Sequence, residues 1–356
     1  MAPRKKTSRI FVGNMPVGDG SPISVQSMTK TDTRDVKTTV KQIKSLAKAG
    51  CEIIRIAVPG IEAAKALGSI KKAVAVPVIA DIHFDWRLAL EAIHQGVDGL
   101  RINPGNIGAK WKVAEVVSAA SDRHVPIRIG VNAGSLSKKL LAKYRHPTPE
   151  ALLESAEDHI NILEQLNFRE IKVSLKASNV PTTVYAYRLF SSSFRYPLHI
   201  GISEAGPPFT GTIKSSVGLG ILLAEGIGDT VRVSLSADPH EEIRVAYEIL
   251  KSLGLRERGA NIISCPTCGR CEIDIRGLAA KAEARLKNID KPLTIAVMGC
   301  VVNGPGEARE ADLGIAGGKG VGLLFRKGKI LKRVEENELL NELMAEIKKY
   351  DEGWQG

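Results

Sequence analysis

The sequence predicts an α/β protein: a (β/α)8 barrel of the TIM type followed by a small α+β domain. Short β-like runs recur along the first two-thirds of the chain, and segments with apolar residues at helical spacing separate them. The length agrees, because 356 residues suit one large domain and a small one. A polar stretch, LGLRERGAN at 253–261, marks the expected boundary between residues 1–258 and residues 259–356.

Eight β-like runs supply the predicted barrel strands. In chain order they are ISVQSM (23–28), CEIIRIAV (51–58), PVIADI (77–82), GLRINP (99–104), PIRIGV (126–131), EIKVSL (170–175), LHIGIS (198–203) and TVRVSL (230–235). Helices are expected between them, for example at 35–50, 149–167 and 238–254. This alternation is typical of a parallel sheet, and eight such units suit a closed barrel. A doubly wound open sheet is the alternative, but no strand is followed by G-x-G-x-x-G.

Five of the eight strands carry a cation between aliphatic residues: Arg55, Arg101, Arg128, Lys172 and Arg232. Side chains alternate between the two faces of a strand, and the aliphatic neighbours suit the face that packs on the helices. The cations are therefore expected to point into the barrel, near the strand ends where barrel enzymes bind ligands. Buried cations require an anion, most simply a phosphate or diphosphate. Internal salt bridges at the barrel floor are the alternative.

Other polar residues lie at the predicted strand ends. Those expected to donate hydrogen bonds to phosphate oxygens are Lys176, Asn103, Asn132, Ser234 and Ser236. Asp81 and Glu204 are the carboxylates best placed to neutralise the cations, and Glu204 suits a proton relay equally well. His83 and His199 are expected to be packed, hydrogen-bonded side chains rather than catalysts.

The remainder of the chain predicts a small α+β domain. Its expected elements are a strand at IISC (262–265), a helix near 273–288, strands at LTIAVMG (293–299) and DLGIA (312–316), a hairpin at 321–334 and a helix near 335–350. Four of the five cysteines lie here. The fifth, Cys51, begins the second barrel strand and is expected to be a buried, inert thiol.

The cysteines cluster in SCPTCGRC (264–271) and MGCVVNGPGE (298–307). A C-x-x-C turn lets two thiolates bind one metal centre, and the spacing favours an iron–sulfur cluster and a four-thiolate zinc site about equally. Glu307 ends the glycine-containing loop after Cys300 and could reach a metal bound there, which would give iron an exchangeable carboxylate ligand. A surface turn residue is the alternative reading of Glu307.

Composition excludes some classes of protein. The net charge of +11 could serve nucleic-acid binding, but only 4% of residues are aromatic and no recognition motif is present. No run has the ~20 apolar residues of a membrane helix. The N-terminal MAPRKKTSRI lacks the apolar region of a signal peptide and predicts a solvated tail on a cytoplasmic protein.

Four segments together resemble the bacterial 4-hydroxy-3-methylbut-2-en-1-yl diphosphate synthase family. They are SCPTCGRC, MGCVVNGPGEAREADLGIAGG, VSLKASN and ISVQSMTKTDT, and the resemblance runs from about residue 8 to 350. It implies reductive ring opening and dehydroxylation of 2-C-methyl-D-erythritol 2,4-cyclodiphosphate in isoprenoid biosynthesis, with electrons from reduced ferredoxin or flavodoxin. It also implies one [4Fe-4S] cluster per chain, held by Cys265, Cys268, Cys300 and Glu307.

The resemblance also implies roles for the barrel residues. The residues that match the family's substrate-binding positions are Arg55, Arg101, Arg128, Asn132, Lys176, Arg232 and Ser234. Glu204 matches the catalytic acid, and Asn303 and Glu307 lie in the cluster loop. Cys271 lies outside the family's ligand pattern, and the family's lysine is Lys176 rather than Lys172.

Barrel geometry adds a prediction about assembly. The last barrel helix should end at the N-terminal face of the strands, far from the anion site, so a head-to-tail homodimer would bring one chain's cluster domain to the other's barrel. The family resemblance implies the same.

The rival predictions are a non-redox phosphate-ester barrel enzyme with a structural zinc site, similar to pterin synthases, and an RNA-binding module with a zinc knuckle.

Overall fold

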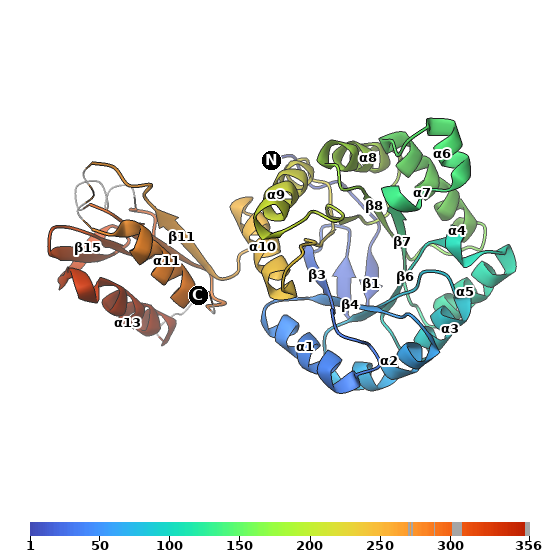
Figure 1. The fold of residues 1–356 in the computed structure, drawn as a ribbon, viewed down its shortest axis with the longest axis horizontal. Coiled ribbons are helices and arrows are strands. Elements are labelled where there is room, and N and C mark those ends of the chain that lie inside the picture. The colour runs from blue at the N-terminus through green and yellow to red at the C-terminus, as the bar shows by residue number, and fades with distance from the viewer. Residues whose placement is uncertain (270, 272, 288, 301–307, 353–356) are drawn as a thin grey trace. The chain divides into compact units, whose positions relative to one another are not determined.

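The structure is a computed structural model that describes residues 1–269, 271, 273–287, 289–300 and 308–352 (Figure 1). The chain divides into two compact units, Met1–Arg256 and Glu257–Gly356. The division falls within the polar stretch at 253–261. No helix among the described residues is both long and apolar enough to cross a membrane.

The first unit is built on eight parallel strands, which confirms the predicted barrel. The strands are β3 (Ser24–Met28), β4 (Ile53–Ala57), β5 (Val78–Asp81), β6 (Gly99–Ile102), β7 (Ile127–Asn132), β8 (Ile171–Lys176), β9 (His199–Ile200) and β10 (Thr230–Val231). Their order in the sheet is β8-β7-β6-β5-β4-β3-β10-β9. A parallel bridge between Val173 and Leu198 links the two ends of that order, so the sheet closes.

Helices surround this ring of strands (Figure 1). The main ones are α1 (Val36–Lys48), α2 (Ile61–Ala73), α3 (Trp86–His94), α5 (Lys110–Asp122), α7 (Pro149–Glu164), α8 (Val180–Ser193), α9 (Pro208–Ala224) and α10 (Pro239–Ser252). Two shorter helices, α4 (Pro104–Ile107) and α6 (Lys138–Tyr144), follow β6 and β7. Side-chain caps fix several starts: Asp35, Thr148 and Asn179 each accept a hydrogen bond from a backbone N–H three residues on.

Strands β9 and β10 are shorter than the runs that predicted them. After β9 the chain turns, with Glu204 at φ +50° and Gly206 at φ +117°. Backbone pairing nevertheless continues, because the Arg232 N–H donates to the Ile200 carbonyl and a bridge joins Gly206 to Leu235. The turn places Glu204 at the C-terminal ends of the strands.

Most residues of the N-terminal tail are exposed, as predicted, but the tail is also held on the barrel. The Arg4 guanidinium forms an ion pair with the buried Asp229 at 2.8 Å, and the N–H of Lys5 donates to the Gly226 carbonyl. A hairpin, β1 (Ile10–Val12) and β2 (Met15–Val17), then packs on Ile53 and Ile79 of the barrel. The tail is held because the barrel's N-terminal end presents apolar side chains that need cover and a buried carboxylate that needs a cation.

The second unit is an α+β domain, as predicted. Its sheet has the order β11-β12-β13-β14-β15, parallel up to β13 and antiparallel thereafter. The elements are β11 (Ala260–Ser264), α11 (Ile275–Leu286), β12 (Leu293–Met298), β13 (Leu313–Ala316), β14 (Val321–Arg326), β15 (Lys329–Glu335), the 3-10 turn η2 (Glu336–Glu338) and α13 (Leu339–Glu352). The ends of β11 and β12 carry the cysteines, so parallel pairing brings the two cysteine motifs to one edge of the sheet.

Candidate functional site

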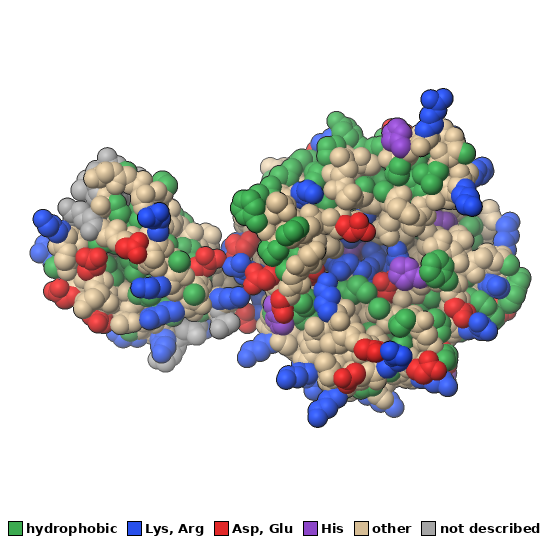
Figure 2. Space-filling view, in the orientation of Figure 1, with side chains coloured by type: hydrophobic (Ala, Val, Ile, Leu, Met, Phe, Trp, Pro, Cys, Tyr) green, Lys and Arg blue, Asp and Glu red, His purple; other side chains and the backbone are tan. Residues whose placement is uncertain are grey.

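Buried cations line the barrel interior, as the strand pattern predicts. Arg55, Arg101, Arg128, Lys172 and Lys176 are each no more than 8% exposed, and Arg232 is half-buried. Arg101 pairs with Arg128 in the sheet register, and Arg128 pairs with Lys172. Figure 2 shows Lys and Arg side chains gathered in a hollow at the centre of the barrel face.

Strand β8 contributes two lysines at different depths. Residues four apart on a strand share a face, so Lys172 and Lys176 both point inward. Lys176 is the last residue of the strand, and its ammonium lies close enough to the arginines for their charges to act on it. The Lys172 ammonium lies lower, 3.5 Å from Thr230 Oγ1. Depth therefore separates the two lysines, and only Lys176 is placed at the strand end where ligands of barrel enzymes bind.

Two inward glycines make room for the cations. A Cβ atom on Gly130 would lie 2.5 Å from Arg101 Nε, and one on Gly201 would lie 2.8 Å from Lys176 Nζ. The Gly201 Cβ would also lie 2.4 Å from the carbonyl oxygen of Arg232, which is backbone and cannot swing away. The Arg101 side chain thus lies over Gly130 and the Lys176 side chain over Gly201, where the Cβ atom of any other residue would collide with them. The strand pattern did not reveal this role.

Among the described residues, two carboxylates face the arginines, and a third, Asp229, lies near Lys172 but is paired with Arg4. Asp81 lies 3.4 Å from Arg55 Nε and 3.2 Å from Arg101 Nη1, as predicted. The sequence reasoning missed Glu242 in the first turn of α10, which is 2% exposed and accepts hydrogen bonds from Ser27 Oγ and the Leu235 N–H. A second acidic residue directly after Glu241 was the available signal. Among the described residues these carboxylates are fewer than the six cations, and two of them also pair with other cations, Glu242 with Lys30 and Asp229 with Arg4. Internal salt bridging therefore does not account for the cation cluster.

Burial and mutual repulsion disfavour the charged forms of the cations. Burial, with Arg232 adding to it, lowers the pKa of Arg55 to about 9. Burial and nearby arginines also hold the pKa values of Arg128 and Lys176 well below their ordinary values. Burial alone would raise the pKa of Asp81, but Arg55 and Arg101 outweigh it and the pKa is lowered. A bound anion would relieve this repulsion.

Replacing Lys172 with methionine is expected to stabilise the ligand-free protein by about 1–3 kcal/mol at pH 7. Burial, with Arg128 nearby, lowers the Lys172 pKa to about 7 in the folded chain. The unfolded chain therefore binds a proton that the folded chain releases, which lowers the free energy of unfolding at pH 7 and less so as pH rises toward 10. Urea unfolding at pH 7 and pH 10 should show a gain that shrinks with pH. The control is the exposed Lys41→Met, and an equal gain at both pH values would contradict the assignment.

The two histidines differ from their expectations. His199 is fully buried as predicted, but neither of its ring nitrogens has a hydrogen-bond partner among the described residues. Burial, with Lys176 and Arg128 nearby, lowers its pKa well below the ordinary value, so the ring is neutral. His83 is half-exposed, 3.2 Å from Arg101 Nη1. His83 Nε2 lies 3.7 Å from Asp81 Oδ1, and within the described residues no ion pair joins either ring to another carboxylate.

The remaining predicted barrel residues lie near the strand ends. Asn132 pairs with Lys176 in the register of β7 and β8, and Ser234 is half-buried two residues beyond Arg232. Glu204 is exposed in its left-handed turn. In the part of the chain that the structure describes, no ion pair joins Glu204 to the cations, so Asp81 and Glu242 act as the counter-charges instead.

The cysteines of the second unit gather around Gly299. The Gly299 N–H donates to Cys265 Sγ at 3.1 Å, and the Cys271 N–H donates to the Cys268 carbonyl to close the turn. A Cβ on Gly299 would lie 2.6 Å from Cys271 Sγ, so only glycine fits before Cys300. Cys268 is exposed and the other three thiols are half-buried. Asn303 and Glu307 lie outside the described residues.

The thiolate chemistry of this donor set suits both centres that the spacing predicts, an iron–sulfur cluster and a four-thiolate zinc site. Among the described residues, no group of three or more Cys, His, Asp and Glu side chains is arranged to hold a metal ion. The barrel thiol, Cys51, is buried as predicted, and burial raises its pKa to about 12.

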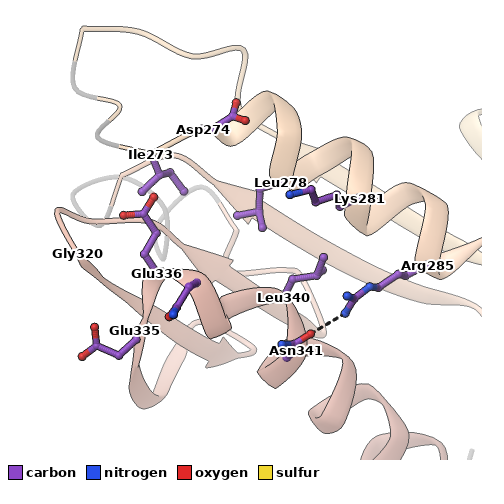
Figure 3. Close-up of a pocket in the computed structure, with 11 residues that line it drawn as sticks. Ile273, Asp274, Leu278, Lys281, Arg285, Gly320, Glu335, Glu336, Leu340 and Asn341 are labelled. Carbon is purple, nitrogen blue, oxygen red and sulfur yellow. Dashed lines mark hydrogen bonds between the residues drawn. The ribbon is translucent and has the colours of Figure 1, made fainter.

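A surface pocket of the second unit lies apart from these residues. It lies between α11 and the segment from η2 into α13, and Arg285 bonds Asn341 across it at 2.9 Å (Figure 3). Lys281 and Glu336 also line it, so its charges are mixed. Of the predicted site residues that the structure describes, none lines it.

Two family descriptions cover most of the chain: the GcpE TIM-barrel domain matches residues 7–247, and the GcpE protein C-terminal domain matches residues 261–349. This chain belongs to the GcpE family. Its curated relatives include the 4-hydroxy-3-methylbut-2-en-1-yl diphosphate synthase (flavodoxin) of Thermodesulfovibrio yellowstonii, 64% identical over 98% of this chain and 100% of that protein. The enzyme of the same name from Geobacter sulfurreducens is 63% identical over 97% of this chain and 98% of that protein.

The barrel of this GcpE chain also resembles solved structures of other enzymes. Dihydropteroate synthase from Stenotrophomonas maltophilia superposes with a TM-score of 0.51 at 11% identity, over 70% of this chain and 97% of that one. At this identity the likeness concerns the fold alone. The GcpE match over both units, rather than this barrel likeness, identifies the family.

Proposed function

We propose that this chain is a 4-hydroxy-3-methylbut-2-en-1-yl diphosphate synthase, an oxidoreductase of isoprenoid biosynthesis. Its reaction would be the reductive ring opening and dehydroxylation of 2-C-methyl-D-erythritol 2,4-cyclodiphosphate to (E)-4-hydroxy-3-methylbut-2-enyl diphosphate. The observation that carries this proposal is the set of six inward cations, which outnumber the carboxylates that face them among the described residues, in a GcpE chain whose second unit holds four cysteines.

In this proposal the barrel, residues 1–258, binds the cyclic diphosphate. Arg55, Arg101, Arg128, Lys176 and Arg232 would hold the phosphate oxygens, and Asn132 and Ser234 would add hydrogen bonds at the strand ends. Cations fixed before the substrate arrives stabilise negative charge on the leaving oxygen as the C–O bond of the ring breaks. Support comes from their burial, which keeps water from screening that charge.

The second unit, residues 259–356, would hold one [4Fe-4S] cluster per chain. Cys265, Cys268, Cys300 and Glu307 would be the ligands, with Asn303 in the same loop. When bound, the cluster would pass on the two electrons that the reduced donor supplies and would offer a Lewis-acidic iron. The support is the approach of the thiols at one sheet edge, with Gly299 leaving room for them.

Replacing Glu204 with glutamine is expected to lower kcat by about 10²–10⁴-fold, with KM nearly unchanged. We assign Glu204 the proton that leaves with the substrate's hydroxyl, because it lies in the turn after β9 and, within the described part of the chain, no ion pair joins it to the cations. Steady-state kinetics with a reduced electron donor would measure both constants. A large rise in KM with kcat intact would instead make Glu204 a binding residue.

The electron donor would be a reduced flavodoxin, the donor in the printed names of the relatives, or a ferredoxin. Both are acidic proteins, and a net charge of +11 favours their encounter with this chain. The reaction needs no nucleic acid or membrane partner, and we place it in the cytoplasm.

We further propose a head-to-tail homodimer. Arg256, the last residue of the first unit, bonds the Ile23 carbonyl and Glu52, which precede β3 and β4. The chain thus leaves the barrel at the face opposite the cation cluster, and a second copy would supply the cluster domain to each barrel mouth. Sedimentation should give twice the chain mass for the active enzyme, and an active monomer would overturn this arrangement.

Iron, acid-labile sulfide and zinc content would test the function directly. Anaerobically purified protein should contain about four iron and four sulfide per chain, as a cubane cluster requires. Turnover of the cyclic diphosphate should then depend on a reduced donor. One zinc and no sulfide, even after anaerobic reconstitution, would favour the non-redox phosphate-ester enzyme with a structural zinc site.

A further inference from the structure

The sulfur of Cys271, which the proposed ligand set does not use, lies beside that of Cys265. A Cβ atom on Gly299 would lie 2.6 Å from Cys271 Sγ and 3.2 Å from Cys265 Sγ. Because both sulfurs lie close to this one point, they are within about 6 Å of each other, and side-chain rotation can close such a gap to bonding distance.

The surroundings single out this pair among the thiols. Cys265 and Cys271 are both half-buried and pack against the hydrophobic core of the second unit, whereas Cys268 is exposed. Cys265 Sγ accepts the Gly299 N–H, and the Cys271 thiol donates to the Ile273 carbonyl at 3.3 Å. These bonds fix both sulfurs over Gly299, so the pair is held together by the fold rather than by chance proximity in a loop.

We propose that Cys265 and Cys271 form a disulfide bond when the chain lacks its cluster, and that this bond protects Cys265 from irreversible oxidation. The inference rests on the proposed function, in which Cys265 binds iron and is unavailable while the cluster is present. Loss of the cluster frees the Cys265 thiol next to Cys271.

The chemistry needs a thiol oxidant, for which a low-molecular-weight disulfide suffices. The Cys265 thiolate attacks that disulfide, forms a mixed disulfide and releases one small thiol. Cys271 then attacks Cys265 Sγ, forms the internal bond and releases the second small thiol. The two protein thiols are oxidised, and the small disulfide takes up their two electrons and two protons.

Protection follows from the oxidation chemistry of cysteine. A free thiol attacked by hydrogen peroxide becomes a sulfenic acid, and further peroxide converts it to a sulfinic acid that thiols do not reduce. With Cys271 adjacent, the sulfenic acid condenses to the disulfide and releases water. A dithiol reductant then restores both cysteines, and Cys265 can bind iron again.

Peptide mapping of the full-length chain would test the pairing. The cluster is removed anaerobically with a chelator, the protein is treated with oxidised glutathione, and free thiols are alkylated before digestion. We expect a Cys265–Cys271 linkage as the main product, and its absence from protein that retains the cluster. A main product that links Cys271 to Cys268 or Cys300, or only glutathione adducts, would overturn the proposal.

Reconstitution after peroxide would test the protection. Cluster-free wild type and Cys271→Ser receive the same peroxide pulse, then dithiothreitol, iron and sulfide, and bound iron and cluster absorbance are measured. We expect about 3–10-fold less recovery in Cys271→Ser, with Cys51→Ser recovering like wild type. Equal recovery would overturn the protective role, as would failure of untreated Cys271→Ser to bind a cluster, which would make Cys271 a ligand. If wild type never binds iron, the proposed function fails while the peptide map still decides the pairing.

Discussion

Replacing Cys265 with serine is expected to abolish cluster binding and to lower turnover by at least ~10³-fold. Cys265 directly follows β11, and its sulfur is held against the Gly299 N–H, which fixes it at the sheet edge where Cys300 follows β12. A serine oxygen is a harder and weaker ligand for iron than a thiolate. Iron and sulfide analysis of anaerobically purified protein would measure the loss.

The Cys265 result has two matched controls in the same chain. Cys51→Ser removes a thiol that is buried in the barrel, and Cys271→Ser removes one that lies beside Cys265. Both variants should retain about four iron per chain and wild-type turnover under anaerobic conditions. Full iron and sulfide content in Cys265→Ser would show that cluster binding does not depend on Cys265.

Replacing Arg128 with methionine is expected to weaken substrate binding while stabilising the ligand-free protein. Arg128 is 3% exposed, and the hydrogen bond it donates goes to Ser174 Oγ at 3.1 Å. Its burial and the nearby Arg55 and Arg101 disfavour the charge. Removing it relieves that repulsion, for a gain of about 1–3 kcal/mol, but loses a charge-assisted bond to phosphate, for a loss of about 10–100-fold in affinity.

Thermal unfolding with and without the cyclic diphosphate would separate the two effects of Arg128→Met. The midpoint should rise without ligand, and the further rise on adding ligand should be smaller than in wild type. Arg123→Met, which removes an exposed arginine, should change neither value. A lower midpoint without ligand would mean that Arg128 stabilises the barrel by its own packing and bonds.

Local periodicity was enough to predict the barrel and its cation cluster. Because side chains alternate between the two faces of a strand, a cation between two aliphatic residues is expected to point inward when the aliphatic residues face the helices. Each of the five strands with such a cation lies close to its predicted position in the chain. Parallel pairing likewise predicts that the two cysteine motifs meet. The roles of Asn303 and Glu307 in the loop after Cys300 remain predictions, because both residues lie outside the described residues.

Contacts between distant segments could not be predicted in this way. Glu242 belongs to a helix start, where acidic residues are expected for the helix dipole, so the pair of Glu241 and Glu242 was a weak signal that did not by itself indicate a counter-charge in the barrel. Glycine is needed at positions 130 and 201 because side chains or backbone of neighbouring strands lie directly over them. The unpaired nitrogens of His199 likewise depend on the whole barrel interior.

The binding of the N-terminal tail has a consequence for how the chain folds during synthesis. The N–H of Ala2 donates to the Ala224 carbonyl, and Arg4 pairs with Asp229, so the first residues translated have partners more than 200 positions later. Contacts of such long sequence separation form late and slowly. The first strands therefore leave the ribosome before the residues that bind the N-terminal tail have been translated, so the N-terminal end of the barrel stays incompletely covered until then. The barrel closes only when the eighth strand arrives, so truncation before residue 229 should yield an aggregation-prone chain rather than a smaller stable barrel.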